Sequence, residues 1–131
     1  MSVLEIAPLQ IAKLTREMLA AYARASLDPN PIHLEDTAAQ AAGLPGVIAH
    51  GMLIAGLIQE RAQRFRAETA AQAQMDRFQI RFKAMSFPGE EIWVGGRAKE
   101  SAPGVWELDL QAKNERGELK AQSQVRIKLA P

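Results

Sequence analysis

The chain has 131 residues, a length typical of one domain, and we expect residues 1–131 to form a single domain. Its 16 basic and 15 acidic residues nearly cancel, which gives no electrostatic reason to expect nucleic acid or a membrane as a partner. The absence of cysteine excludes disulfides and thiolate catalysis. The sequence has neither a signal-peptide pattern nor a long apolar run, so we expect a cytoplasmic protein.

The first half of the chain carries helical patterns. Thr15 is a good N-cap for a helix over residues 16–26, and a shorter helix is predicted over residues 36–42. Residues 47–58 read VIAHGMLIAGLI, which is apolar on every side of a helix and therefore predicts a helix that is buried on most sides.

The second half alternates between apolar and polar residues with the period of two that is typical of strands with one wet face. This pattern occurs in residues 76–85, 92–99, 106–113 and 119–129, and short turns separate the four runs. Consecutive strands joined by short turns predict an antiparallel meander with one apolar face. We therefore expect an α+β domain in which the sheet curls around the apolar helix, with residues 9–14 as a further edge strand.

A polar cluster stands in residues 26–33, which read SLDPNPIH. Its two prolines disfavour a helix, so Asp28, Asn30 and His33 are expected on a stiff loop. Histidine can take or give a proton near neutral pH, and a nearby carboxylate can fix its tautomer or hold a water molecule with it. The residues alone leave two interpretations open, a catalytic pair or a turn with a structural histidine.

A second candidate is the pair His50 and Gly51 within the apolar segment. A buried histidine needs a hydrogen-bond partner, and a core histidine bonded to a backbone carbonyl is one interpretation. Glycine lets a ligand approach its backbone N–H, and this N–H would stabilise a developing oxyanion if the helix begins near residue 51. The alternative is close helix packing at a small residue.

Metal binding is a third option for the acids and histidines. The side chains that could assemble such a site are Asp28, His33, Glu35, Asp36 and His50. No familiar metal-ligand spacing occurs among them, so we expect no metal.

Three stretches of the sequence resemble the sequence patterns of a known family. Residues 26–35 read SLDPNPIHLE, residues 46–52 read GVIAHGM and residues 81–90 read RFKAMSFPGE. In this order they resemble the patterns S-G-D-x-N-P-[IL]-H-x-[DE], G-x-I-[AV]-H-G-M and R-F-x-x-P-V-x-P-G-D of the MaoC-like dehydratases, the (R)-specific or type 2 enoyl-CoA hydratases. The resemblance covers most of the chain. It implies a hot dog fold, in which an antiparallel sheet wraps around a long central helix.

The resemblance also implies an activity, the reversible hydration of a trans-2-enoyl thioester to an (R)-3-hydroxyacyl thioester. It implies no cofactor, because coenzyme A or acyl carrier protein enters as part of the substrate. Asp28 and His33 would be the catalytic pair, Asn30 would orient the water or the pair, and the Gly51 N–H would polarise the thioester carbonyl. The residues expected around the substrate are Leu27, His50, Met52 and Gly56.

This sequence departs from the family pattern at Leu27, where the family usually has glycine. Leucine does not easily adopt a positive φ, so we expect the loop to enter differently or the side chain to narrow the pocket. Met85 replaces a frequent proline, and Gly56 stands where some relatives have a serine that assists substrate binding. We expect short or medium acyl chains.

Two alternatives stay open beside the hydratase. One is a hot dog acyl-CoA thioesterase, and the other is one subunit of a heteromeric dehydratase. The resemblance implies a homodimer or a higher homo-oligomer, with a heterodimer as the alternative assembly.

Overall fold

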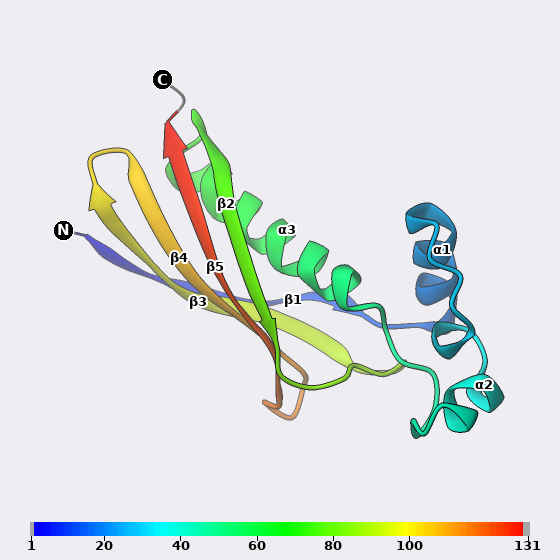
Figure 1. Cartoon of the computed structure of the whole chain (residues 1–131). Coiled ribbons are helices and arrows are strands. Elements are labelled where there is room, and N and C mark those ends of the chain that lie inside the picture. Colours follow the sequence, from blue (N-terminus) through cyan, green and yellow to red (C-terminus); the bar gives the residue numbers. More distant parts are fainter. Residues whose placement is uncertain (1, 130–131) are drawn as a thin grey trace.

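A five-stranded antiparallel sheet forms the body of the molecule, and one long helix lies along one of its faces (Figure 1). The computed structural model describes residues 2–129. Its strands are β1 (Val3–Lys13), β2 (Ala73–Phe82), β3 (Glu91–Ala102), β4 (Val105–Lys113) and β5 (Leu119–Leu129). Its helices are α1 (Arg16–Ser26), the 3₁₀ helix η1 (Pro31–His33), α2 (Asp36–Ala41) and α3 (Gly51–Thr69).

The strand order is β1-β3-β4-β5-β2, so the predicted meander is correct for β3, β4 and β5 and wrong for β2. β2 pairs with β5 at one edge of the sheet, and residues 83–90 then cross to β3. The crossing is needed because β1 occupies the place beside β3 that the meander would have given to β2. β1 is also longer than the predicted strand over residues 9–14. The two-residue period indicates which face a side chain occupies, but it carries no information about which strands are neighbours.

The apolar face of the sheet packs on α3, as the alternating pattern predicts. Phe65 of α3 meets Trp106 of β4 edge to face, with ring centroids 5.6 Å apart. The apolar residues that alternate along the central strands are buried, among them Ile92, Val94, Leu108, Leu110, Val125 and Ile127. The buried residues of α3 are Ile54, Ala55, Ile58, Arg61, Ala62 and Phe65. In the part of the chain that the structure describes, no helix combines the length and apolar composition needed to cross a membrane.

Lys120 breaks the alternation of β5. The pattern predicts its side chain on the wet face, but only 1% of that side chain is exposed. The register of β4 and β5 shifts between Ala112 and Lys113, and Lys120 falls at the skipped position. Its ammonium group forms an ion pair with the buried Glu90 at 3.0 Å and donates a hydrogen bond to the carbonyl oxygen of Met85 at 2.7 Å.

Residues 14–50, which we call the excursion, connect β1 to α3 and lie outside the sheet. The excursion lies beyond the N-terminal end of α3 in Figure 1 and contains α1, η1 and α2. The Thr15 hydroxyl accepts a hydrogen bond from the Met18 N–H at 3.0 Å, as its predicted capping role requires. The predicted helix over residues 36–42 is confirmed within one residue.

The long apolar helix begins later than its hydropathy indicates. Residues 47–50 are not helical, and α3 starts at Gly51, as the oxyanion interpretation of that glycine requires. The Ile48 N–H donates to the carbonyl oxygen of Ile32, and the Ala49 N–H donates to that of Ser86. These hydrogen bonds hold residues 47–50 in an extended path between η1 and the crossing segment, so Val47 and Ala49 are buried without a helix.

Candidate active site

The stiff loop predicted around residue 30 forms the short 3₁₀ helix η1. Asn30 is its N-cap: the side-chain Oδ1 accepts a hydrogen bond from the Ile32 N–H at 3.2 Å. Asn30 is exposed and does not line the cavity described below. Its side chain therefore acts on the geometry of His33 through the backbone of η1.

The buried ring of His33 has a defined orientation. Its Nδ1 lies 2.8 Å from the carbonyl oxygen of Ile48. A carbonyl oxygen only accepts, so Nδ1 carries the hydrogen and donates it. In the neutral ring the lone pair is then on Nε2, which is the arrangement that a general base needs.

His50 lies against both catalytic candidates. Its Nε2 donates a hydrogen bond to the backbone carbonyl oxygen of Asp28 at 3.0 Å, as the core-histidine interpretation expects. Its ring stacks on the His33 ring, with centroids 3.7 Å apart and planes inclined by 23°, and Tyr22 meets it edge-on at 4.9 Å. His50 is 3% exposed, and its Nδ1 has no hydrogen-bond partner among residues 2–129. The ring therefore joins the Asp28 backbone to the His33 ring.

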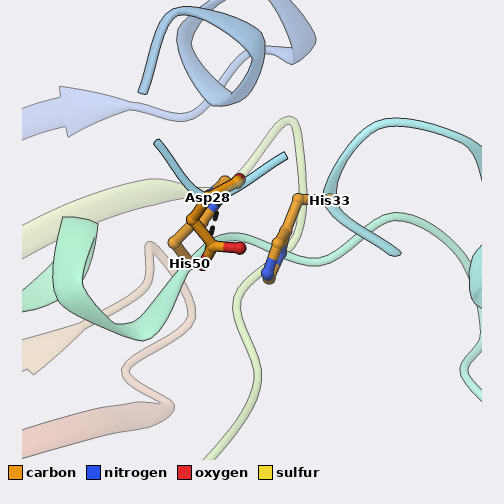
Figure 2. A group of neighbouring side chains, drawn as sticks. All are labelled: Asp28, His33 and His50. Atoms are coloured by element: carbon orange, nitrogen blue, oxygen red, sulfur yellow. Dashed lines mark hydrogen bonds and ion pairs between the residues drawn. The ribbon is translucent and has the colours of Figure 1, made fainter. Parts of the chain in front are cut away.

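The Asp28 carboxylate converges with the two histidines. One carboxylate oxygen and one ring nitrogen from each histidine all lie within 4.8 Å of one another. In Figure 2, Asp28 and His50 lie on the same side of the His33 ring. Polar atoms that are up to 4.8 Å apart can share one water molecule that hydrogen-bonds to each of them at about 2.8 Å. The Asp28 side chain is 55% exposed, so water reaches it freely.

The same three side chains are also the only set among residues 2–129 with the spacing of a metal site. Of the five residues considered from the sequence, the structure thus brings three together. Asp36 lies elsewhere, because its carboxylate accepts hydrogen bonds from the Arg16 guanidinium at 2.8 Å and the Val47 N–H at 3.0 Å. Both contacts hold the pKa of Asp36 below its usual value, the Val47 N–H more than Arg16. They also fix the position of the segment that leads to Gly51.

Gly51 is the first residue of α3, and its N–H is one of the first four of the helix, which have no partner within the helix. The positive end of the helix dipole lies here. A Cβ atom on residue 51 would lie 3.1 Å from the Cζ atom of Phe82, which is closer than the ring tolerates without moving. The glycine therefore leaves room both for Phe82 and for a ligand atom at its N–H.

These groups share one cavity of about 470 Å³. It is lined by Tyr22, Ser26, Asp28, His33, His50, Gly51, Met52 and Phe82. Tyr22, Ser26 and Phe82 were not predicted as site residues. Tyr22 and Ser26 are four residues apart on α1, so the helical period was a signal that they share a face. Phe82 lies in residues 81–90, the third stretch that resembles the family. Its place in that stretch was the sequence signal that it could be a site residue.

The expectation that Leu27 narrows the pocket is wrong. Leu27 ends α1 in the left-handed conformation, with φ 58° and ψ 36°. The Asp28 N–H donates to the carbonyl oxygen of Ala23 at 3.0 Å, a C-capping hydrogen bond that this conformation permits. The leucine thus adopts a positive φ, although the sequence led us to expect that it would avoid one. Its side chain is 87% exposed and lines no part of the cavity, so it does not narrow the pocket.

Gly56 also lies away from the predicted site. It is exposed on α3, a Cβ atom there would meet nothing within 4 Å, and it does not line the cavity. Of the four residues expected around the substrate, the structure brings His50 and Met52 to the cavity and leaves Leu27 and Gly56 outside it.

Comparison with protein families and curated sequences gives consistent matches. A family model described as "MaoC like domain" matches residues 5–115 of the chain. The fatty acid synthase beta subunit TOXC of Cochliobolus carbonum is 37% identical over 93 residues, which cover 71% of this chain and 4% of that protein. The chain thus corresponds to a small part of that fungal subunit.

Comparison with solved structures shows the fold. The (R)-hydratase from A. caviae involved in PHA biosynthesis has a TM-score of 0.85 at 23% identity, over 99% of this chain and 98% of that one. A chain of the ChsH1-ChsH2 complex from Mycobacterium tuberculosis has a TM-score of 0.78 at 16% identity, over 98% and 96% of the two chains. The predicted α+β hot dog fold is therefore confirmed.

Proposed function

The chain belongs to the family of MaoC-like domains, and from this premise we propose that it hydrates trans-2-enoyl thioesters reversibly to (R)-3-hydroxyacyl thioesters. One observation carries the proposal: the Asp28 carboxylate, the His33 ring and the N-terminus of α3 at Gly51 line the same cavity. The likeness in fold to an (R)-hydratase supports the choice of product.

Asp28 and His33 hold the water that attacks. The water donates one hydrogen bond to the Asp28 carboxylate and the other to Nε2 of His33, because Nδ1 is occupied by the Ile48 carbonyl oxygen. As the water oxygen bonds to the β-carbon, the pair takes one of its protons. General base help of this kind contributes roughly 10²–10⁴-fold to the rate.

The Gly51 N–H stabilises the negative charge that this attack creates. Addition to the β-carbon moves an electron pair through the α-carbon to the thioester oxygen. A donor that is fixed in place for such an oxygen is typically worth about 3 kcal/mol in the transition state. Because the Gly51 N–H has no partner within the helix, it can donate without first breaking a hydrogen bond.

The pair then returns a proton to the α-carbon, so the protons balance and no electrons are gained or lost. The residues therefore suffice for the reaction without a redox cofactor, and coenzyme A or acyl carrier protein enters as part of the substrate. His50 acts as a positioning residue, because it holds the Asp28 backbone and stacks on the His33 ring.

Hydration of crotonyl-CoA tests this proposal. We expect Asp28→Asn and His33→Ala each to lower kcat at least 100-fold, with the folded state retained, because each removes half of the pair. Asp109→Asn is a matched control, since this carboxylate lies on β4 outside the cavity. Near wild-type rates in either site variant would contradict the proposed role. Release of free thiol instead of loss of the enoyl group would favour the thioesterase.

The partner of the chain is part of the same proposal. The ChsH1-ChsH2 complex is heteromeric by its name, and its fold is similar to that of this chain. This chain carries the Asp28 and His33 pair, so we expect it to be the active member of any such assembly and to form homodimers when it is purified alone. Inactivity of the pure protein that a second hot dog subunit relieves would identify a heteromeric dehydratase.

A further inference from the structure

A second cavity of about 360 Å³ adjoins the candidate active site. Gly51 and Phe82 line both cavities, and no other residue does. The second cavity, which we call the apolar chamber, has mostly apolar walls with two polar residues among them. Besides Gly51 and Phe82 it is lined by Ile48, Ala49, Ile54, Ala84, Met85, Ser86 and Lys120. The two cavities therefore meet at the contact between Phe82 and Gly51.

Phe82 forms this wall with its ring. It is the last residue of the edge strand β2 and is 50% exposed, and the tip of its ring would lie 3.1 Å from a Cβ atom on residue 51. An aromatic ring in this position blocks the path from the Gly51 N–H into the apolar chamber. The rest of the contact is glycine, so Phe82 supplies nearly all of the side-chain volume at this boundary.

The far wall of the apolar chamber is held in place by hydrogen bonds. The Ala49 N–H donates to the carbonyl oxygen of Ser86 at 2.8 Å, and Lys120 Nζ donates to that of Met85 at 2.7 Å. The buried Glu90 holds Lys120 through their ion pair. Burial raises the pKa of Glu90, but hydrogen bonds from Asn114, the Phe87 N–H and Lys120 outweigh it and hold the pKa below its usual value. The chamber is thus a fixed feature of the crossing segment.

We infer that Phe82 sets the acyl-chain length of this protein by closing the apolar chamber to the distal methylene groups of the substrate. The inference rests on the proposed function. A thioester whose carbonyl binds at Gly51 and whose β-carbon faces Asp28 must direct the remaining acyl carbons out of the polar cavity. The nearest apolar volume lies behind Phe82, so the wild-type protein accepts short chains and an opened wall admits longer ones.

The test compares Phe82→Ala with Phe78→Ala. Phe78 lies on the same strand and packs against the core, but it lines neither cavity. We expect the ratio of kcat/KM for trans-2-octenoyl-CoA to that for crotonyl-CoA to rise at least tenfold in Phe82→Ala. Each buried methylene is worth about fourfold in binding, and the two substrates differ by several. Phe78→Ala should leave this ratio within about twofold of the wild type. Phe82→Leu, a smaller change, should move it in the same direction and replaces the alanine variant if that variant does not fold.

Filling the chamber should have the opposite effect. Ala84→Leu adds volume inside the chamber without touching the wall, and in the Phe82→Ala background it should return the ratio toward the wild-type value. A ratio that Phe82→Ala and Phe82→Leu both leave unchanged, in an enzyme that hydrates crotonyl-CoA, would overturn the inference and leave the proposed function intact.

Binding of unreactive ligands separates the two proposals. Butyryl-CoA and octanoyl-CoA have no double bond to hydrate, so the proposed reaction does not consume them. Calorimetry then measures their Kd, provided that no free thiol is released. We expect the preference for octanoyl-CoA to increase at least tenfold in Phe82→Ala. Such an increase in a protein that hydrates no enoyl-CoA would support the chamber as an acyl site and contradict the proposed reaction. An unchanged preference would overturn the chamber as an acyl site.

Discussion

The body of the molecule and the excursion are built by different interactions. The sheet and α3 are held by apolar side chains that are almost fully buried, such as Ile58 and Leu110. The excursion also buries apolar side chains such as Leu14, Leu19 and Val47, but it adds polar contacts that position the site. The His50 ring donates a hydrogen bond to the Asp28 carbonyl oxygen, and the Asp36 carboxylate accepts one from the Val47 N–H. Because the polar contacts of the excursion position the site, we expect mutations in the body to affect mainly stability and mutations at these contacts to affect catalysis as well.

The largest expected effect on stability is in the body. Ile58→Ala removes a fully buried side chain of α3 and should lower the free energy of unfolding by about 2–5 kcal/mol. Denaturant unfolding measures this loss. The activity per folded molecule should stay close to that of the wild type, because Ile58 does not line the site cavity. A large loss of kcat in the folded variant would contradict the separation of the two regions.

In the excursion, His50→Phe should lower both catalysis and stability. The phenyl ring keeps the stacking on His33 but leaves the Asp28 carbonyl oxygen without its donor. We expect a stability loss of about 1–3 kcal/mol, together with a fall in kcat of roughly 10–100-fold because Asp28 is no longer held in place.

The role of His50 as a positioning residue predicts how the kinetic constants divide. In His50→Phe, kcat should fall while KM changes little, and His50→Gln should recover part of kcat because it restores an N–H donor. A selective rise in KM with unchanged kcat would show instead that His50 contributes to substrate binding.

The excursion also contains a stabilising change. Leu27→Gly places a glycine at a left-handed position, where a residue with a Cβ atom is strained by about 1–2 kcal/mol. Part of this gain is lost because glycine makes the unfolded chain more flexible. We expect a net stabilisation of about 1 kcal/mol, or a rise of a few degrees in Tm, and an unaltered rate with crotonyl-CoA. A fall in Tm would show that the exposed leucine side chain contributes more than its backbone strain costs.

The smallest effect concerns pH. The pKa of Asp36 is lower in the folded protein than its usual value, so the charged carboxylate stabilises the folded state above the usual aspartate range. This contribution is lost as the pH falls through the lowered pKa. Asp36→Asn removes the titrating group, so its Tm should depend less steeply on pH below about pH 4 than that of the wild type. Equal slopes for the two proteins would contradict the assigned contacts.

Much of the body could be predicted from the sequence because local patterns determine it. The period of two in β3, β4 and β5 indicates the buried face of each strand, and Thr15 indicates the start of α1. The place of β2 could not be predicted, because pairing with β5 depends on a neighbour that is distant in sequence. The burial of Lys120 was missed for a similar reason, since it depends on a register shift between two strands.

The candidate site also combines features that local sequence patterns predict with features that depend on residues distant in the sequence. The residue chemistry made Asp28, His33 and Gly51 candidates, and the resemblance implied their roles. The stiff loop around residue 30 follows from its two prolines. The stacking of His33 on His50 could not be foreseen, because the two residues are brought together by the extended path of residues 47–50. That path contradicts the helical hydropathy of the stretch. The wall formed by Phe82 depends on its contact with Gly51, which no sequence pattern contains.

The most direct test of the account is a crystal structure of Asp28→Asn with crotonyl-CoA bound. We expect the thioester oxygen within about 3 Å of the Gly51 nitrogen, with the β-carbon facing a water molecule that lies between the side chain of residue 28 and Nε2 of His33. A thioester bound away from the N-terminus of α3, or a β-carbon turned away from His33, would contradict it.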